Sequence, residues 1–172
     1  MELVFFGSAL LLVALLTRLL GRGAARRRRH FFKQRQARRV LAKIASIPIP
    51  QQRMAYLRKI DPLVFEELIL EALEQAGHQV HRSRSYSGDG GIDGRAVING
   101  TPYLIQSKRY SGHISKQHVL DFAALLERHS AKGLFCHTGR TGQFSKDLQR
   151  SHPLLTIVSG DRLLNLLLNQ RA

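Results

Sequence analysis

The stretch IDGRAVINGTPYLIQSK, residues 92–108, decides the fold. Two runs rich in apolar and β-branched residues flank Asn99-Gly100. Asn-Gly between such runs is the strongest short signal for a β-hairpin, because both residues tolerate the positive φ of a type I′ turn. A two-residue loop pairs Ile98 with Thr101, and each step outward along one strand is matched by a step along the other. The stretch therefore predicts two antiparallel strands in a known register.

That register gathers polar side chains on one face of the hairpin. Counting outward from the turn, Asp93 lies opposite Gln106 in a non-hydrogen-bonded pair, with Cα atoms ~4.5 Å apart. Lys108 is two residues beyond Gln106 and shares its face, because side chains alternate along a strand. A β-bulge would shift this arrangement by one residue. We therefore expect a carboxylate, an amide oxygen and an ammonium within a few ångströms of one another.

A helix expected upstream adds a second carboxylate. Asp61 is a typical N-cap residue, and Pro62 suits the first helical position. From Phe65 onward, apolar residues recur at helical spacing and predict one buried face. Glu66 lies at the margin of that face, where an unpaired charge is costly. Two interpretations stay open: a first-turn glutamate whose head reaches water, or a group that joins the cluster on the hairpin.

Such a cluster suits metal-assisted hydrolysis of a phosphodiester. Mg²⁺, or Mn²⁺ in its place, prefers oxygen ligands, and Asp93, the Gln106 amide oxygen and the Ser107 carbonyl could supply them. Glu66 would orient a water, and Lys108 would position that water or offset charge in the transition state. Each member also has a purely structural interpretation, as a turn residue, a strand residue or a strand-end charge.

The N-terminal segment predicts a membrane anchor. Residues 3–20 are mostly apolar and carry one charge, Arg18, and an 18-residue helix would extend about 27 Å, close to the hydrocarbon thickness of a bilayer. Residues 18–43 carry 11 Lys and Arg and no acid, out of a formal net charge of +15. Positive residues flanking a span stay in the cytoplasm. A secretory signal peptide, or a nucleic-acid-binding arm, are the alternative interpretations of these two segments.

Three blocks together resemble a known family. They are Asp61-Pro62-x-x-Phe65-Glu66, residues 90–94 (GGIDG) and residues 103–110 (YLIQSKRY). They are similar to the catalytic domain of the Mrr-type restriction endonucleases, a branch of the PD-(D/E)xK nuclease superfamily in which glutamine replaces the second acid. The resemblance extends over about residues 61–168.

The resemblance implies a fold, an activity and a site. The fold is α/β, a restriction-endonuclease-like central mixed β-sheet flanked by helices, here preceded by one N-terminal transmembrane helix. The activity is Mg²⁺-dependent cleavage of DNA. Carried over by position, the catalytic residues are Glu66, Asp93, Gln106 and Lys108. Downstream, the pattern fits helices at 115–128 and 143–150, strands at 133–138 and 154–158, and a last helix that begins near 159–161.

Weaker candidates follow the second strand of the hairpin. Arg109, Lys116 and Arg140 are expected in or near loops, where they would contact DNA phosphates or remain solvated charges. The single cysteine, Cys136, excludes an internal disulfide and a cysteine-built zinc site.

These observations predict three regions: a transmembrane anchor at 1–25, a basic helical neck at 26–60 and an Mrr-like nuclease domain at 61–172. The expected protein is a single-pass protein of a bacterial inner membrane, with a cytoplasmic endodeoxyribonuclease that acts in restriction-type defence or DNA processing. Its expected partners are DNA, membrane lipids at the N-terminal helix and arginine run, and a second copy in a homodimer. The alternative is a non-catalytic, membrane-tethered DNA-binding protein that retains the nuclease fold.

Overall fold

The computed structural model describes residues 28–83 and 91–168. The chain divides into two compact units, Met1–Lys33 and Gln34–Ala172. The membrane span predicted at residues 3–20 lies outside the described residues. Within 28–83 and 91–168, no helix combines the length and the apolar character needed to cross a membrane.

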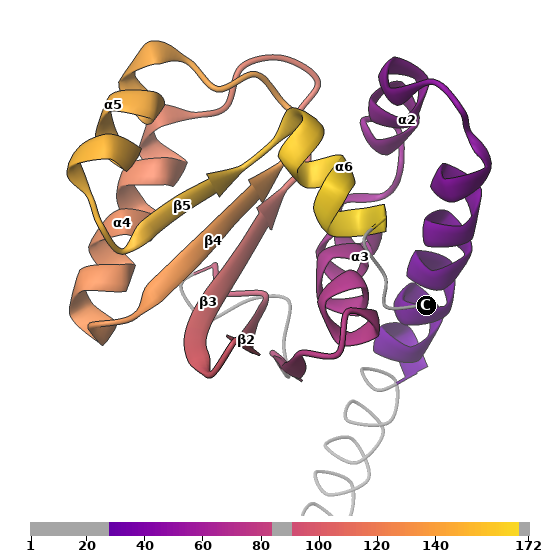
Figure 1. Cartoon of the computed structure of the whole chain (residues 1–172), viewed down its shortest axis with the longest axis horizontal. Helices are drawn as coiled ribbons and strands as arrows, with labels where there is room; N and C mark the ends of the chain where they lie inside the picture. Colours follow the sequence, from indigo (N-terminus) through magenta and orange to yellow (C-terminus); the bar gives the residue numbers. More distant parts are fainter. Residues whose placement is uncertain (1–27, 84–90, 169–172) are drawn as a thin grey trace, which may run out of the picture. The chain divides into compact units, whose positions relative to one another are not determined.

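The second unit is built around a five-stranded mixed sheet (Figure 1). The strands lie side by side in chain order: β1 (Gln79–Arg82), β2 (Gly94–Ile98), β3 (Thr101–Lys108), β4 (Lys132–His137) and β5 (Leu155–Val158). The first three strands are antiparallel, and β3, β4 and β5 are parallel. The carboxyl ends of the three parallel strands therefore meet at one edge of the sheet, and the mixed sheet predicted from the sequence is confirmed.

Helices cover both faces of this sheet (Figure 1). The helices are α2 (Pro50–Leu57), α3 (Pro62–Gln75), α4 (Lys116–His129), α5 (Gln143–Ser151) and α6 (Gly160–Leu168). One core cluster joins α3 and α6 to the sheet, and a second joins α4 to the other face. The helices and strands expected downstream of residue 114 are present, with ends within two residues of the expected ones.

The region expected to be a neck contributes to the first core cluster. A helix runs through residues 28–46, and its part within the second unit buries Ala37, Leu41 and Ile44. Leu57 of α2 is also fully buried in this cluster. The compact unit thus extends back to Gln34, well before the domain start expected at Asp61.

The hairpin has the predicted register over its paired length. Ile98 pairs with Thr101 and Gly94 with Ile105, and the turn residues Asn99 and Gly100 have φ of 50° and 77°. Beyond Gly94 the pattern changes, because the Asp93 N–H donates to the Ile105 carbonyl at 2.9 Å. Asp93 and Gly94 thus face one residue of β3, as in a β-bulge, and Asp93 does not lie opposite Gln106 as predicted.

A close approach of neighbouring elements accompanies this departure. A Cβ at Gly94 would lie 2.9 Å from the His81 carbonyl oxygen and 2.9 Å from Leu70 Cδ2. Only glycine lets β1 and α3 come so near β2 at this point. The bulge is therefore found where the hairpin fits against two other elements.

Candidate active site

Asp93 is held at the end of the hairpin by backbone groups. The Ser107 N–H donates to Asp93 Oδ2 at 2.5 Å. The Asp93 carbonyl accepts from the Ser83 N–H at 3.0 Å, which ties the residue to the end of β1 as well. Because these partners belong to the main chain, the position of the carboxylate follows from strand pairing.

Glu66 comes to the same place from the second turn of α3. Asp61 caps this helix as predicted, since its side chain accepts from the N–H groups of Leu63 and Val64. Burial raises the pKa of Glu66 to about 7, and attraction to Lys108 opposes that shift. This glutamate therefore holds its proton to a higher pH than an exposed glutamate does.

The pKa values of Asp93 and Glu66 both respond to the charge of Lys108, and that of Asp93 also responds to Glu66. Burial raises the pKa of Asp93 well above its usual range, and repulsion from Glu66 raises it further. The Ser107 N–H and the charge of Lys108 act in the opposite direction. Two carboxyl groups in a poorly solvated place, with the charge of one ammonium to offset theirs, resist full ionisation. Glu66, Asp93 and Lys108 are thus close enough for each carboxyl group to feel the charge of the lysine.

Gln106 is buried on β3, with 6% of the residue exposed. Its Oε1 has no hydrogen-bond partner among the described residues. Its amide nitrogen lies against the backbone of Gly91, because a Cβ there would be 2.3 Å from Gln106 Nε2. No hydrogen bond joins Gln106 to Asp93 in the described part of the chain. The contact with Gly91 was not foreseen, although the Gly90-Gly91 doublet next to Asp93 was a signal that could have indicated it.

The donor atoms of this site fit a hard divalent cation. An orphaned amide oxygen, a carboxylate and a second carboxyl with raised pKa all gain from a positive ion nearby. Across residues 28–83 and 91–168, no cluster of three or more His, Cys, Asp or Glu side chains is arranged to hold a metal. A site assembled here would therefore rely on amide and main-chain oxygens in addition to carboxylates, as the predicted set of Asp93, Gln106 and Ser107 does.

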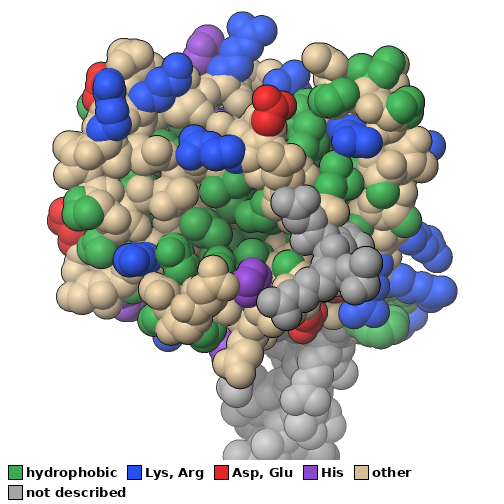
Figure 2. Space-filling view, in the orientation of Figure 1, with side chains coloured by type: hydrophobic (Ala, Val, Ile, Leu, Met, Phe, Trp, Pro, Cys, Tyr) green, Lys and Arg blue, Asp and Glu red, His purple; other side chains and the backbone are tan. Residues whose placement is uncertain are grey.

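The weaker candidates have separate surroundings. Arg109 donates from Nη1 to the Arg58 carbonyl at 2.5 Å, so part of its guanidinium supports the end of α2. Lys116 Nζ lies 5.4 Å from the ring centre of Phe144. Arg140 is exposed, and its backbone bonds to Gly112 and Ile114. Basic side chains gather along the upper part of the face in Figure 2, toward the carboxyl ends of the parallel strands.

Comparisons with known proteins found a matching family, a similar enzyme and a similar solved structure. The family Mrr_cat, described as restriction endonuclease, matches residues 57–167. The type IV methyl-directed restriction enzyme EcoKMrr of Escherichia coli (strain K12) is 28% identical over 120 residues, which are 65% of this chain and 40% of that enzyme. The chain thus aligns with less than half of this relative. A solved structure of the MspJI restriction endonuclease with a 27-mer oligonucleotide has a TM-score of 0.43 at 18% identity, over 78% of this chain and 30% of the other.

Proposed function

We propose that this chain, which belongs to the Mrr_cat family of restriction endonucleases, hydrolyses DNA phosphodiester bonds with the help of Mg²⁺ or Mn²⁺. The observation that carries the proposal is the Asp93 carboxylate, which the Ser107 N–H fixes next along the strand from the buried Gln106, whose Oε1 is unpartnered among the described residues. The pKa shifts of Asp93 and Glu66, which both respond to Lys108, support it. Perturbed carboxyl groups that share a cationic partner are typical of catalytic sites. Restriction endonucleases generally use divalent metal ions, and the oxygen donors around Asp93 support that requirement here.

Three oxygen donors would hold the ion: the Asp93 carboxylate, Gln106 Oε1 and the Ser107 carbonyl. A bound divalent ion makes a neighbouring water more acidic and offsets negative charge on the phosphate. The burial of Gln106, whose Oε1 lacks a partner in the described residues, supports this assignment. The site would thus use one strongly held acid and neutral oxygens, where many metal sites use several acids.

The side chains of this chain have separate tasks in the proposed reaction. With a pKa of about 7, Glu66 can accept a proton from the attacking water near neutral pH. Lys108 would stabilise the charge that develops on the phosphate. Asp93 is kept in place by the Ser107 N–H, so that its carboxylate needs no rearrangement to bind the ion.

The cellular setting is proposed from the sequence. Residues 3–20 would anchor the chain in a bacterial inner membrane, with lipid contacts at the arginine run and the nuclease domain in the cytoplasm. The substrate would be foreign or modified DNA in restriction-type defence, or DNA processed at the membrane. A homodimer would suit cleavage of both strands. Fractionation of cells that express the full chain tests the anchor, since a soluble product would contradict it.

A cleavage assay tests the activity. The full chain, purified in detergent, should convert supercoiled plasmid to nicked or linear DNA with Mg²⁺ and should not do so with EDTA. Asp93→Ala and Lys108→Ala should each lower the rate at least about 100-fold, whereas Lys132→Ala, an exposed lysine at the opposite end of the parallel strands, should not. Equal rates for all four proteins would remove the proposal. Metal-independent DNA binding without cleavage by the wild type would favour a non-catalytic DNA tether.

A further inference from the structure

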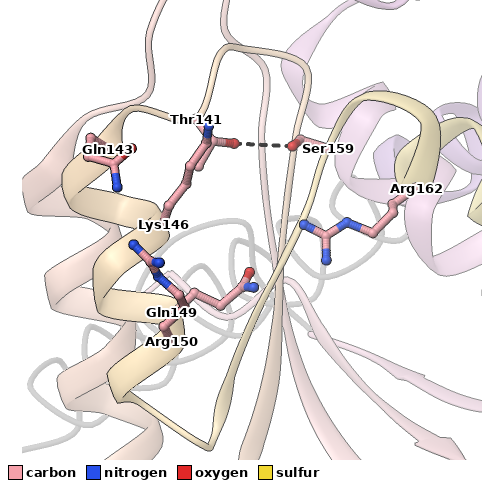
Figure 3. Close-up of a pocket in the computed structure, with 7 residues that line it drawn as sticks. All are labelled: Thr141, Gln143, Lys146, Gln149, Arg150, Ser159 and Arg162. Carbon is pink, nitrogen blue, oxygen red and sulfur yellow. Dashed lines mark hydrogen bonds between the residues drawn. The ribbon is translucent and has the colours of Figure 1, made fainter.

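A cavity of about 460 Å³ lies beside β5, lined by residues of α5 and α6 and of the loops that follow β4 and β5 (Figure 3). Three cationic side chains line it: Lys146 and Arg150 from α5, and Arg162 from α6. Its lining among the described residues includes no carboxylate. Figure 3 shows Lys146, Arg150 and Arg162 around one space, with polar side chains between them. The cavity thus has the charge of an anion site.

Hydrogen bonds hold the polar lining in place. Gln149 Oε1 accepts from the Ile157 N–H at 2.7 Å, which leaves the amide NH₂ of Gln149 as a donor. The hydroxyls of Thr141 and Ser159 lie 3.1 Å apart, and Thr141 Oγ1 is also 3.1 Å from His137 Nε2. These residues follow β4 or β5, or pack against β5, so the back of the cavity is tied to the sheet. A fixed wall with donors reduces the cost of ordering a bound anion.

The three cationic side chains of the cavity are exposed and can reach a ligand. Arg150 pairs with Asp147, but both side chains are largely exposed, so the pair is weak. Lys146 and Arg162 hydrogen-bond no carboxylate in the described part of the chain, and both residues are exposed. Lys146 and Arg162 could therefore bind a phosphate group without first breaking a buried ion pair. Arginine and lysine bind phosphate oxygens strongly by charge-assisted hydrogen bonds.

Two residues that line the cavity, Thr141 and Ser159, follow β4 and β5 at the end of the sheet where β3 ends with Lys108. Lys108 pairs with His137 at the end of β4, and Cys136 pairs with Val158, which directly precedes Ser159. Neighbouring strands lie about 4.8 Å apart, so the ends of β3 and β5 are separated by roughly 10 Å. Phosphates of one DNA strand follow at about 3.4 Å along the duplex axis, which makes that separation a few nucleotides.

We propose that this cavity binds a backbone phosphate of the substrate DNA, a few nucleotides from the phosphate that is cleaved. The inference rests on the proposed function, because it takes the cluster of Glu66, Asp93 and Lys108 as the place of cleavage. Lys146 and Arg162 are the principal phosphate contacts, and the Gln149 amide is a neutral donor. The contact would set how the DNA strand crosses the sheet edge and would carry no base specificity.

The test removes the two available cations and compares an equal loss of charge elsewhere. The double variant Lys146→Ala/Arg162→Ala is measured beside Arg128→Ala/Lys132→Ala, two exposed residues at the opposite edge of the sheet. Affinity for a 20-base-pair duplex is followed by fluorescence anisotropy with the full chain in EDTA, from about 50 to 300 mM KCl. The cavity variant should bind roughly tenfold more weakly at 150 mM, and its salt slope should be lower by about 1 to 2. The control should change less than about threefold.

Further measurements separate the possible results. In plasmid cleavage with Mg²⁺, the loss in the cavity variant should fall mainly on KM, and Lys146→Arg/Arg162→Lys should restore most of the affinity. Equal losses in cavity and control variants, with a wild type that binds and cleaves DNA, would overturn this inference and leave the proposed function standing. A wild type that neither binds nor cleaves DNA would overturn both. Inorganic phosphate could instead raise the Tm of the wild type and the control but not that of the cavity variant, while all three bind DNA equally well. That result would assign the cavity to a free anion and overturn the DNA contact.

Discussion

The Ser107 N–H donates to Asp93 Oδ2 at 2.5 Å, although the two residues belong to different arms of the hairpin. Lys108 follows Ser107 directly in β3, so this one hydrogen bond also fixes how far Asp93 lies from the backbone of the lysine. A carboxylate fixed by a main-chain donor is set by the path of the backbone, and the candidate metal ligand is ready before any ion binds.

Binding of Mg²⁺ should stabilise the wild-type chain through Asp93. A ligand that binds only the folded state adds RT ln(1 + [L]/Kd), about 1.4 kcal/mol at ten times Kd. At pH 8, differential scanning fluorimetry should show a rise in Tm with Mg²⁺ that is lost in Asp93→Ala. The control is Asp147→Ala, which removes an exposed acid far along the chain from the site. A rise of equal size in Asp93→Ala would contradict the assignment of the ligand.

Glu66 should make the folded chain less stable as pH rises. Its pKa in the folded state is about 7 against a usual value of 4.5, so the folded state holds more protons than the unfolded state between these values. Stability therefore falls as pH rises through that window. In metal-free buffer, Glu66→Gln should raise the free energy of unfolding by about 1–2 kcal/mol at pH 8, and hardly at pH 4.5.

Glu74, on the same helix, gives a control of opposite sign. Hydrogen bonding to Arg82 lowers the pKa of Glu74, so its ionised form stabilises the fold above the usual pKa. Glu74→Gln should lower the free energy of unfolding by less than about 1 kcal/mol at pH 8, because this side chain is well exposed. The decrease should become smaller still as pH falls through the lowered pKa of Glu74. Urea titrations at several pH values measure both variants. A Glu66→Gln variant that is less stable than the wild type at pH 8 would show that burial does not dominate at Glu66.

Gly91→Ala should damage the site more than the fold. Gly91 has φ of 89°, and a Cβ there would clash with Gln106 Nε2. We expect Gln106 to be displaced and the cleavage rate to fall at least about tenfold. Gly100→Ala is the matched control, because φ is 77° and nothing lies within 4 Å of its Cβ. Both variants carry backbone strain of about 1 kcal/mol, so their Tm values should fall together while their activities differ. Equal activity in the two variants would exclude a role for the close packing behind Gln106.

Arg82→Ala should be strongly destabilising. Arg82 donates to Glu67, Glu71 and Glu74, and the first two carboxylates are almost fully buried. Removing one partner of buried charges costs about 3–5 kcal/mol, reduced here because Arg38 still bonds Glu71. Arg150→Ala removes an ion pair of exposed side chains and should change stability by less than about 0.5 kcal/mol. Chemical denaturation measures the free energy of unfolding of both variants. Similar losses in the two would show that Arg82 is not needed to offset the charge of the α3 carboxylates.

Local patterns made much of this structure predictable. The hairpin register followed from Asn99-Gly100, since a two-residue turn fixes pairing without reference to the rest of the fold. The start of α3 followed from Asp61-Pro62 for the same reason. The sequence could suggest the cluster of Glu66, Asp93 and Lys108 because two of these residues lie on or beside that hairpin and one near that cap.

The features that were not predicted depend on distant contacts. The departure at Asp93 occurs where Leu70 and His81 press against Gly94, and no local pattern contains that information. The packing of residues 34–46 was not recognised because their apolar positions are interleaved with arginines and a lysine. The basic cavity is assembled from the ends of two strands and two helices, so its members are scattered over residues 141–162.

The strand order bears on how the chain acquires its site. Each strand pairs with the next one in the sequence, so no strand has to insert between two that are already joined. Short loops close fastest, and we expect the hairpin of β2 and β3 to form early, with β4 and β5 added afterwards to an existing edge. Asp93 and Lys108 would then come together early in folding. The segments that fold later would supply the cavity residues proposed to bind the DNA backbone.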